Sequence, residues 1–209
     1  MITVVNIIRG IIIGLIIRLF TVSDIVRYAT LKLAANEINK KNVRGCTAEL
    51  GVYKGDFAKM INAFFPNRKL YLFDTFEGFD KRDVEKEIEI GHKGAFEKDF
   101  TNKDIELVLR KMPERKNCIV KKGWFPETAK ELDETFAFVS IDADLYEPIY
   151  QGLLYFYQRL EKGGYIFVHD YSHSGELYGA KEAVQRFSQE FNVPYIPLSD
   201  VCGSVVFSK

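Results

Sequence analysis

Short apolar runs of strand length recur along this chain, and each ends in a polar or glycine-containing turn. They are TAEL (47–50), KLYLFD (69–74), NCIVKKG (117–123), FAFVSIDAD (136–144) and YIFVHDY (165–171). Near-continuous apolar runs are typical of strands that are buried on both faces, as in a parallel sheet covered by helices. The pattern therefore predicts an α/β fold, provided that helices separate the runs.

The segments between these runs have the spacing of amphipathic helices. They are 23–41, 56–65, 104–111, 148–160 and 179–191, and VPYIPL and GSVVFSK near the end predict a final strand pair. Residues 79–104 do not fit this alternation, because they are highly charged and show no clear period. We expect them to form a mobile, lid-like insertion. Since no repeat, linker or low-complexity tract interrupts residues 23–209, they are predicted to form one domain.

The charge balance and the cysteines limit the partners and the compartment. Lysine plus arginine and aspartate plus glutamate both total 29, so the formal net charge is zero and we expect no nucleic-acid partner. The three cysteines, Cys46, Cys118 and Cys202, are far apart and form no CxxC pair. This spacing disfavours a zinc site or a disulfide framework and favours a reducing compartment, the cytoplasm.

The N-terminal segment, residues 1–22, is almost wholly apolar. It lacks the basic start and the cleavage site of a secretory signal peptide, and Arg9 would lie inside a membrane span at substantial cost. We predict an apolar helix at an interface. One alternative packs this helix on the domain or on a second subunit, which would give a homo-oligomer. The other lays residues 1–20 on the cytoplasmic face of a membrane, with Arg9, Arg18 and Arg27 near lipid phosphates.

Residues at the carboxyl ends of the strands are the candidates for function, because ligands of open α/β sheets bind there. The five predicted strand ends carry Glu49–Gly55, Asp74, Gly123, Asp142 and His169–Asp170. Four of the five ends carry a carboxylate, whereas ordinary surface acids would not be restricted to strand ends. We therefore expect a ligand site at this edge of the sheet.

The first strand end reads Glu49-Leu-Gly51-Val-Tyr53-Lys-Gly55. Its glycines let the backbone turn sharply and approach a ligand closely. The segment is not the GxGxxG dinucleotide fingerprint, and the chain contains no P-loop GKS or GKT, which disfavours a phosphoryl transferase. An acid in place of the first glycine suits a cationic ligand better than a pyrophosphate. The alternative is a tight turn with a surface glutamate.

The second strand end is Asp74, followed by Thr75 and Phe76. A carboxylate at this position can accept both hydroxyls of a ribose, and Phe76 would then flank an adenine ring. The alternative is a solvated loop.

Asp142 and Asp170 are separated by one strand–helix–strand unit, so we expect them on neighbouring strand ends together with His169. Two carboxylates and a histidine there can hold a hard divalent ion such as Mg²⁺. The ion would lower the pKa of a substrate hydroxyl, and a nearby base would remove the proton. The alternatives are a core or supporting role for His169 and a place for Asp144 and Glu147 at a helix start, whose positive end favours acids. Asp142 is the stronger candidate because it lies nearer the strand end.

Together these motifs resemble the macrocin O-methyltransferase (TylF/MycF-like) family of class I S-adenosylmethionine-dependent methyltransferases. The matching stretches are AELGVYKGDFA, LFDTFEGF, KKGWFPETA, SIDADLYEPIYQGLLYFYQRLEKGGYIFVHDY and GAKEAVQRF, in order across residues 48–187. The resemblance implies a single-domain, Rossmann-like fold with a mostly parallel seven-stranded sheet and helices on both faces. It also implies S-adenosylmethionine as methyl donor, a bound Mg²⁺, and a sugar hydroxyl of a glycan, glycolipid or glycosylated metabolite as acceptor.

The resemblance also assigns expected roles to single residues. Glu49 and Gly51 would lie near the methionine part of the cofactor, Asp74 would hold its ribose, and Asp142 and Asp170 would be metal ligands. The full set of expected cofactor-binding residues is Glu49, Gly51, Tyr53, Gly55, Asp74, Thr75, Phe76, Gly123, Trp124, Phe125 and Asp142, of which Gly123, Trp124 and Phe125 would lie near the adenine.

One position departs from the family pattern, which commonly has Asp-Asp-Tyr at the fifth strand end where this chain has His169-Asp170-Tyr171. A neutral histidine is a softer donor for Mg²⁺ than a carboxylate. Three alternatives stay open: weaker metal binding, a different ion, or His169 as general base, since its usual pKa lies near neutrality. We predict an S-adenosylmethionine-dependent O-methyltransferase with Asp142 and His169 in catalysis. The alternatives are a non-catalytic Rossmann-like binding or regulatory protein and an NAD(P) oxidoreductase.

Overall fold

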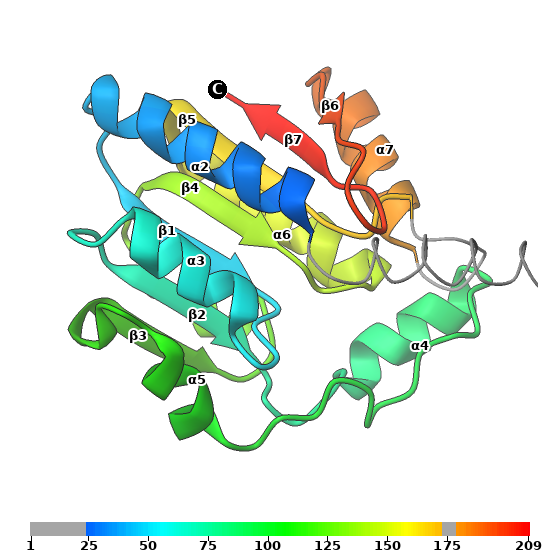
Figure 1. Ribbon diagram of the computed structural model, residues 1–209. Coiled ribbons are helices and arrows are strands. Elements are labelled where there is room, and N and C mark those ends of the chain that lie inside the picture. Colours follow the sequence, from blue (N-terminus) through cyan, green and yellow to red (C-terminus); the bar gives the residue numbers. More distant parts are fainter. Residues whose placement is uncertain (1–23, 173–178) are drawn as a thin grey trace, which may run out of the picture.

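A seven-stranded sheet organises the chain in the computed structural model, which describes residues 24–172 and 179–209 (Figure 1). The strands are β1 (Cys46–Leu50), β2 (Leu70–Asp74), β3 (Cys118–Lys122), β4 (Phe136–Ile141), β5 (Leu160–Val168), β6 (Ile196–Pro197) and β7 (Val205–Ser208). Their order across the sheet is β3-β2-β1-β4-β5-β7-β6. Strands β1 to β5 pair in parallel, whereas β7 pairs antiparallel with both β5 and β6. The carboxyl ends of the five parallel strands therefore meet at one edge.

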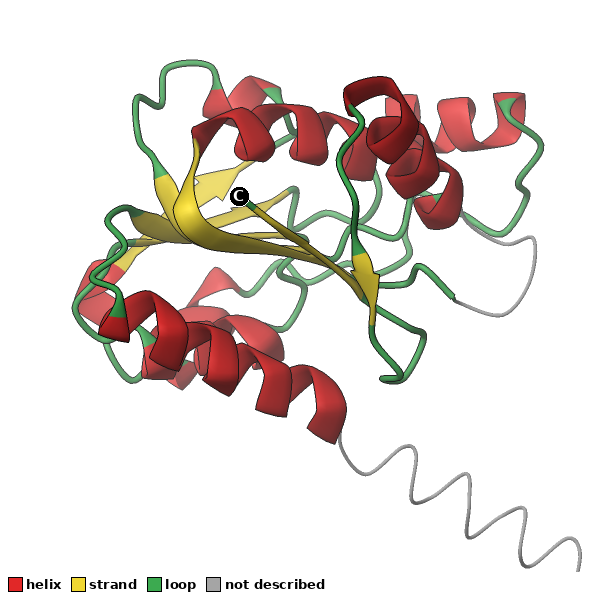
Figure 2. Ribbon diagram, turned by 90° about the horizontal axis from the view of Figure 1, so that it is seen from above, coloured by secondary structure: helices red, strands yellow, loops and turns green. Residues whose placement is uncertain are grey.

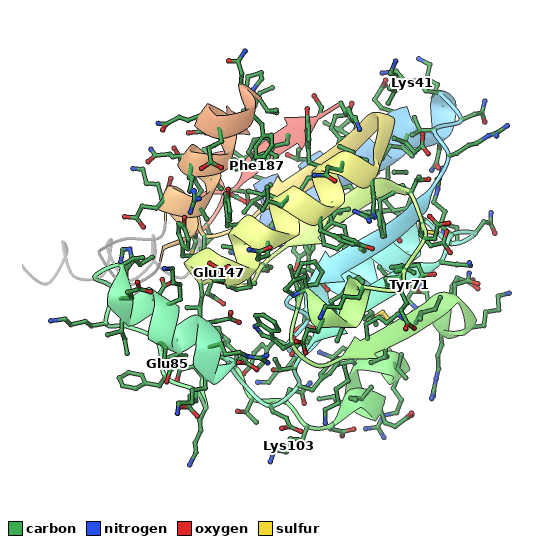
Figure 3. All side chains as sticks on the ribbon, turned by 180° about the vertical axis from the view of Figure 1, so that it is seen from behind. Lys41, Tyr71, Glu85, Lys103, Glu147 and Phe187 are labelled. Carbon is green, nitrogen blue, oxygen red and sulfur yellow. The ribbon has the colours of Figure 1, made fainter. Side chains whose placement is uncertain are left out.

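Helices cover both faces of this sheet (Figure 2). Helices α2 (Ile25–Lys40), α3 (Asp56–Phe64) and α5 (Ile105–Lys111) lie on one face, and α6 (Tyr146–Arg159) and α7 (Ala180–Phe191) lie on the other. Two short 3-10 helices, η1 (Arg115–Asn117) and η2 (Glu127–Ala129), flank β3. Helix α4 (Lys81–Glu89) lies beside the edge at which the parallel strands end. Glu147 marks the end of α6 that lies next to α4 (Figure 3).

The strands are apolar because they are covered on both faces, and every residue of β1 and β4 is buried. Their side chains are divided between two cores, and an irregularity in the β4–β5 register between Phe136 and Phe138 turns these two residues to opposite faces. Phe136 packs toward α6, with its ring centroid 5.1 Å from that of Phe156, and Phe138 packs toward α2 and α3, with its centroid 5.0 Å from that of Phe167. Each fully buried phenylalanine contributes roughly 1.5–3 kcal/mol through removal of its surface from water. Packing in these two cores thus fixes the positions of the strand ends.

The predicted α/β architecture is confirmed, including the mostly parallel sheet, its helices on both faces and the final strand pair. The fifth strand begins earlier than its apolar run, because α6 ends at Arg159 and β5 starts at Leu160. Gly163 and Gly164 therefore lie within a strand rather than after a helix. An added Cβ on Gly164 would lie 2.8 Å from the carbonyl oxygen of Ala137 on β4, so glycine permits this close strand pairing.

The charged segment 79–104 contains a helix that its sequence pattern did not reveal. Helix α4 is capped by Asp80, whose side chain accepts a hydrogen bond from the helix backbone. Its buried positions are Asp83, Val84 and Glu87. Because two of the three buried side chains are acidic, apolar residues alone do not mark the buried face of this helix in the sequence.

Glu87 anchors α4 to the neighbouring helices. Its side chain is fully buried and accepts hydrogen bonds from the backbone N–H groups of Tyr146, at 2.9 Å, and of Gly179. These two groups lie at the starts of α6 and α7, where backbone N–H groups have no partner within the helix. The insertion is thus tied to the domain through this helix.

The apolar segment 1–22, with its predicted membrane or subunit contact, lies outside the described residues. Within the described part, no helix has the length and apolar character needed to cross a bilayer. Arg27 does lie in the described part, and it corrects one expectation. It is 5% exposed and lines the pocket described below, so it does not lie at a lipid headgroup.

Candidate active site

A pocket of about 500 Å³ opens at the edge where the parallel strands end. The predicted site residues that line it are Glu49, Gly51, Tyr53, Asp74, Thr75, Gly123, Trp124, Phe125, Asp142, His169 and Asp170. They come from the ends of all five parallel strands and the turns that follow them. Residues that are far apart in the chain thus lie together at the carboxyl ends of the strands, where ligands of open α/β sheets bind.

Two residues predicted to bind the cofactor lie away from the pocket, and their predicted roles are corrected. The side chain of Phe76 is fully buried in the core on the α3 and α5 face, so it does not flank a ligand. Gly55 begins α3 with φ +76°, and an added Cβ would lie 2.7 Å from Cγ1 of Val108. This glycine therefore permits close packing between α3 and α5 rather than ligand approach.

The turn after β1 packs directly against the end of β4. Gly51 has φ +83°, and an added Cβ would lie 1.9 Å from the carbonyl oxygen of Asp142, so only glycine fits there. Glu49 is 1% exposed, and its Oε2 has no hydrogen-bond partner among the described residues. Burial and the nearby Asp142 carboxylate raise the pKa of Glu49 well above its usual value. A buried carboxylate with an unpaired oxygen on a pocket wall is suited to a cationic ligand group.

Asp74 holds the turn after β1 from the end of β2. Its Oδ2 accepts hydrogen bonds from the backbone N–H groups of Val52 at 2.7 Å and Tyr53 at 2.8 Å. Its Oδ1 accepts one from the backbone N–H of Phe76 at 2.6 Å. A carboxylate oxygen can accept two hydrogen bonds, so Oδ1 keeps capacity for a ribose hydroxyl.

The turn after β3 is tied to α4. The backbone N–H of Gly123 donates to the carbonyl oxygen of Asp74 at 3.0 Å. The indole N–H of Trp124 donates to both carboxylate oxygens of Asp83, at 3.0 and 3.1 Å. The guanidinium of Arg82 lies 3.7 Å from the Trp124 ring centroid. Burial raises the pKa of Asp83 to about 7, although its bond to Trp124 opposes this.

A buried arginine from α2 forms an ion pair with Asp142. Nη1 of Arg27 lies 3.0 Å from Oδ2 of Asp142, and Nη2 donates to Oγ of Ser140 at 3.1 Å. The guanidinium stacks on Phe57, 3.8 Å from the ring centroid. Burial alone would raise the pKa of Asp142, but the charges of Arg27 and His169 outweigh it and hold this pKa below its usual range. Asp142 is therefore an anion at neutral pH.

His169 lies between the two predicted metal-binding carboxylates. Its Nδ1 is 3.2 Å from Oδ1 of Asp142 and 3.0 Å from Oδ2 of Asp170. Its Nε2 is 3.1 Å from the carbonyl oxygen of Val201 and 3.8 Å from Oδ2 of Asp24. Burial alone would lower the pKa of His169, but Asp142 and Asp170 raise it to about 10. Within the described residues both ring nitrogens face acceptors, so the predicted role as general base lacks the free nitrogen it needs.

Asp144 and Asp170 share an uncommon backbone conformation, with φ +57° and +62°. Left-handed conformations of non-glycine residues cost roughly 1–3 kcal/mol each and concentrate at functional sites. Burial and the carboxylates of Asp170 and Asp142 raise the pKa of Asp144 well above its usual value. Burial also raises the pKa of Asp170. Asp144 lines the pocket, so a carboxyl group with a raised pKa faces the ligand space.

Sequence reasoning missed Arg27 and Asp83 and ranked Asp144 below Asp142. Arg27 is 115 positions from Asp142, and a single arginine on a helix carries no local signal. Asp83 lies in a charged segment where one more acid does not stand out. Asp144 did carry a signal, because it is the second acid of the segment that follows β4.

The comparison with protein families identifies the chain's relatives. A family model described as macrocin-O-methyltransferase (TylF) matches residues 20–209. The demethyldecarbamoylnovobiocin O-methyltransferase of Streptomyces niveus is 23% identical over 189 residues, which cover 83% of this chain and 69% of the relative. The 8-demethyl-8-(2,3-dimethoxy-alpha-L-rhamnosyl)-tetracenomycin-C 4'-O-methyltransferase of Streptomyces olivaceus is 23% identical over 207 residues, which cover 90% of this chain and 74% of the relative.

Solved structures share the fold. The structure of the O-methyltransferase NovP superposes with a TM-score of 0.71 at 24% identity, covering 88% of this chain and 80% of that one. The crystal structure of CalS11, a calicheamicin methyltransferase, has a TM-score of 0.68 at 19% identity and covers 87% of this chain and 78% of that one. These likenesses confirm the predicted class I methyltransferase fold.

Proposed function

Because the chain belongs to the macrocin-O-methyltransferase (TylF) family, we propose that it methylates a sugar hydroxyl of a glycan, glycolipid or glycosylated metabolite. O-methyltransferase activity with S-adenosylmethionine as donor follows from the family, and the predicted enzyme class is confirmed. The acceptor class and the roles of single residues are the proposal.

The observation that carries the proposal is the composition of one pocket. Its wall includes the glycine turn after β1 and the acid at the end of β2, which suit an adenosyl cofactor. The same pocket contains Asp142, Asp144 and Asp170. A methyl donor and a hydroxyl acceptor that share this space can meet in line, and such positioning is worth about 7–11 kcal/mol of a reaction barrier in favourable cases.

The cofactor-binding wall has groups that suit three parts of S-adenosylmethionine. The unpaired oxygen of Glu49 accepts from the ammonium of the methionine part. Oδ1 of Asp74 accepts from a ribose hydroxyl. Trp124, held by Asp83, and the neighbouring Phe125 border the adenine. These three contacts place the sulfonium between the turn after β1 and the carboxylates that follow β4 and β5.

The reaction moves one methyl group and one proton. The bond between the sulfonium sulfur and the methyl carbon breaks, a bond between that carbon and the acceptor oxygen forms, and the sulfur keeps the bonding electron pair. The acceptor hydroxyl loses its proton to Asp144, which lines the pocket and whose pKa is raised by burial and by the neighbouring carboxylates of Asp170 and Asp142, so that it binds a proton more strongly than an ordinary aspartate. Asp142 orients the hydroxyl and stays ionised through its pairing with Arg27. The products are S-adenosylhomocysteine and a methyl ether.

The donor set fits the predicted Mg²⁺ poorly. Ligand atoms of Asp142, His169 and Asp170 lie within 4.8 Å of one another, so spacing alone would admit an ion. However, Mg²⁺ prefers oxygen ligands in near-octahedral geometry, and one of the three donors is a ring nitrogen that carries a hydrogen. Oδ2 of Asp142 is already paired with Arg27. The magnesium ion stays a prediction, and no step of the reaction is assigned to it.

The acceptor class is supported by the named relatives. One relative is named as the 4'-O-methyltransferase of a tetracenomycin that carries a rhamnosyl group, and another as an O-methyltransferase of demethyldecarbamoylnovobiocin. The predicted membrane contact of residues 1–20 and the predicted homo-oligomer stay predictions.

Calorimetric titration with S-adenosylhomocysteine and with NAD tests the cofactor assignment. We expect saturable binding of S-adenosylhomocysteine and none of NAD, and the reverse would favour an oxidoreductase. A second experiment tests the base. Asp144→Asn should lower kcat about 10²- to 10⁴-fold while the affinity for S-adenosylhomocysteine stays unchanged. Normal turnover of this variant would remove Asp144 from the mechanism.

A further inference from the structure

We propose that this chain transfers the methyl group without a divalent metal, because Arg27 and His169 supply the two positive charges that such an ion would bring to Asp142 and Asp170. The inference rests on the proposed methyl transfer. It departs from the magnesium ion that the family resemblance implies. Three features of the described residues carry it.

The first feature is the position of the His169 ring. Nδ1 lies 3.2 Å from Oδ1 of Asp142 and 3.0 Å from Oδ2 of Asp170, which are hydrogen-bond distances to both carboxylates that would bind an ion. A ring nitrogen that donates a hydrogen has no lone pair for a metal. The N–H of His169 therefore contacts an oxygen of each carboxylate, as a bridging metal ion would.

The second feature fixes the orientation of that ring. Nε2 lies 3.1 Å from the carbonyl oxygen of Val201, in the loop between β6 and β7. A carbonyl oxygen accepts only, so Nε2 also carries a hydrogen. Turning the ring to offer either nitrogen as a metal ligand would break a hydrogen bond at a side chain that is 14% exposed. Breaking this hydrogen bond would leave a buried donor and a buried acceptor without partners, which is unfavourable.

The third feature is the guanidinium on the other oxygen of Asp142. Arg27 lies 3.0 Å from Oδ2 and is held by Ser140 and by the face of Phe57. A guanidinium keeps its proton throughout the accessible pH range. Both oxygens of Asp142 therefore face cationic or donor groups, and an additional divalent ion would be placed beside a permanent positive charge.

The proposal assigns Arg27 and His169 as positioning residues. They hold Asp142 and Asp170 in fixed orientations, and the acceptor hydroxyl is oriented by these carboxylates and deprotonated by Asp144. The family's usual aspartate at position 169 would remove the bridging N–H and add a third carboxylate. In this chain the His169 side chain thus occupies the place between the two carboxylates that a metal ion would take.

Binding of Mn²⁺, followed by electron paramagnetic resonance in the presence of S-adenosylhomocysteine, tests the proposal without an activity assay. The wild-type protein is expected to bind no Mn²⁺ in the pocket. The double variant His169→Asp/Arg27→Met, with folding checked by circular dichroism, should gain one site. The matched control His92→Asp makes the same histidine change away from the pocket, at a residue paired with Glu182 at 2.7 Å, and should gain none.

Two results would overturn the proposal. One is stoichiometric Mn²⁺ binding by the wild-type protein that is lost in Asp170→Asn. The other is a folded double variant that still binds no Mn²⁺, because His169 and Arg27 would then not be what excludes the ion. A separate assay with a chelator should leave wild-type turnover unchanged. If no sugar acceptor is methylated under any condition, the proposed function fails, and the Mn²⁺ titrations still decide the metal question.

Discussion

The ion pair between Arg27 and Asp142 should contribute measurably to stability. At 3.0 Å and an effective dielectric constant of about 20, the attraction is about 5.5 kcal/mol. Desolvation offsets much of this, because the side chains are only 6% and 25% exposed. Removing one partner leaves the other charged and buried, so Arg27→Met and Asp142→Asn should each lower the free energy of unfolding by about 3–5 kcal/mol.

A double-mutant cycle in chemical denaturation isolates the pair. We expect the double variant to lose less than the sum of the single losses, with a coupling energy of about 1.5–3 kcal/mol. The matched control is the exposed pair Arg115 and Glu106, which is shorter, at 2.8 Å, but whose side chains are 52% and 61% exposed. Its coupling energy should stay below about 1 kcal/mol. Equal coupling in the two cycles would refute the argument that burial strengthens the Arg27 pair.

Three further predictions address other parts of the site. Asp74→Ala should weaken S-adenosylhomocysteine binding about tenfold or more, and unchanged affinity by calorimetry would refute its ribose role. Gly51→Ala should destabilise the fold by clearly more than Gly91→Ala, since both have positive φ but only Gly51 has a backbone oxygen 1.9 Å from the added Cβ; similar melting temperatures would contradict this. The folded pKa of His169, about 10, lies above its usual 6.5, so its stabilising effect is fully present below about pH 6.5 and is lost as pH rises through about 10. The stability difference between wild type and His169→Gln should shrink across that window, and a constant difference would speak against a charged His169.

The fold could be predicted because each element carries a local signal. Strand β4, FAFVSI, is apolar throughout since both of its faces are buried. Helix α3 shows an amphipathic period because one side faces the sheet. Helix α4 gives no such guide to its buried face, since Asp83 and Glu87 occupy buried positions through bonds to partners elsewhere in the chain while its apolar Ile88 is exposed. The spacing of apolar residues predicts which apolar side chains are buried, but it does not predict buried polar side chains.

The site was predictable where topology alone brings residues together. Asp74 ends a parallel strand and Asp142 and Asp170 follow two others within two residues, so their convergence follows from the sheet. The direction of a side chain does not follow from the sheet. Phe76 is two residues beyond Asp74 yet points into the core, and Arg27 reaches Asp142 from a helix that precedes the first strand. The ring orientation of His169 depends on Val201, which is distant in the sequence.

Transfer of a labelled methyl group tests the central claim most directly. The protein is incubated with S-adenosylmethionine carrying a deuterated methyl group and a panel of glycosides, glycolipids and glycan extracts, and the products are read by mass spectrometry. We predict a product with the labelled methyl on a sugar oxygen, absent with Asp142→Asn although that variant still binds S-adenosylhomocysteine. Label on nitrogen or carbon, or equal labelling by Asp142→Asn, would contradict the account.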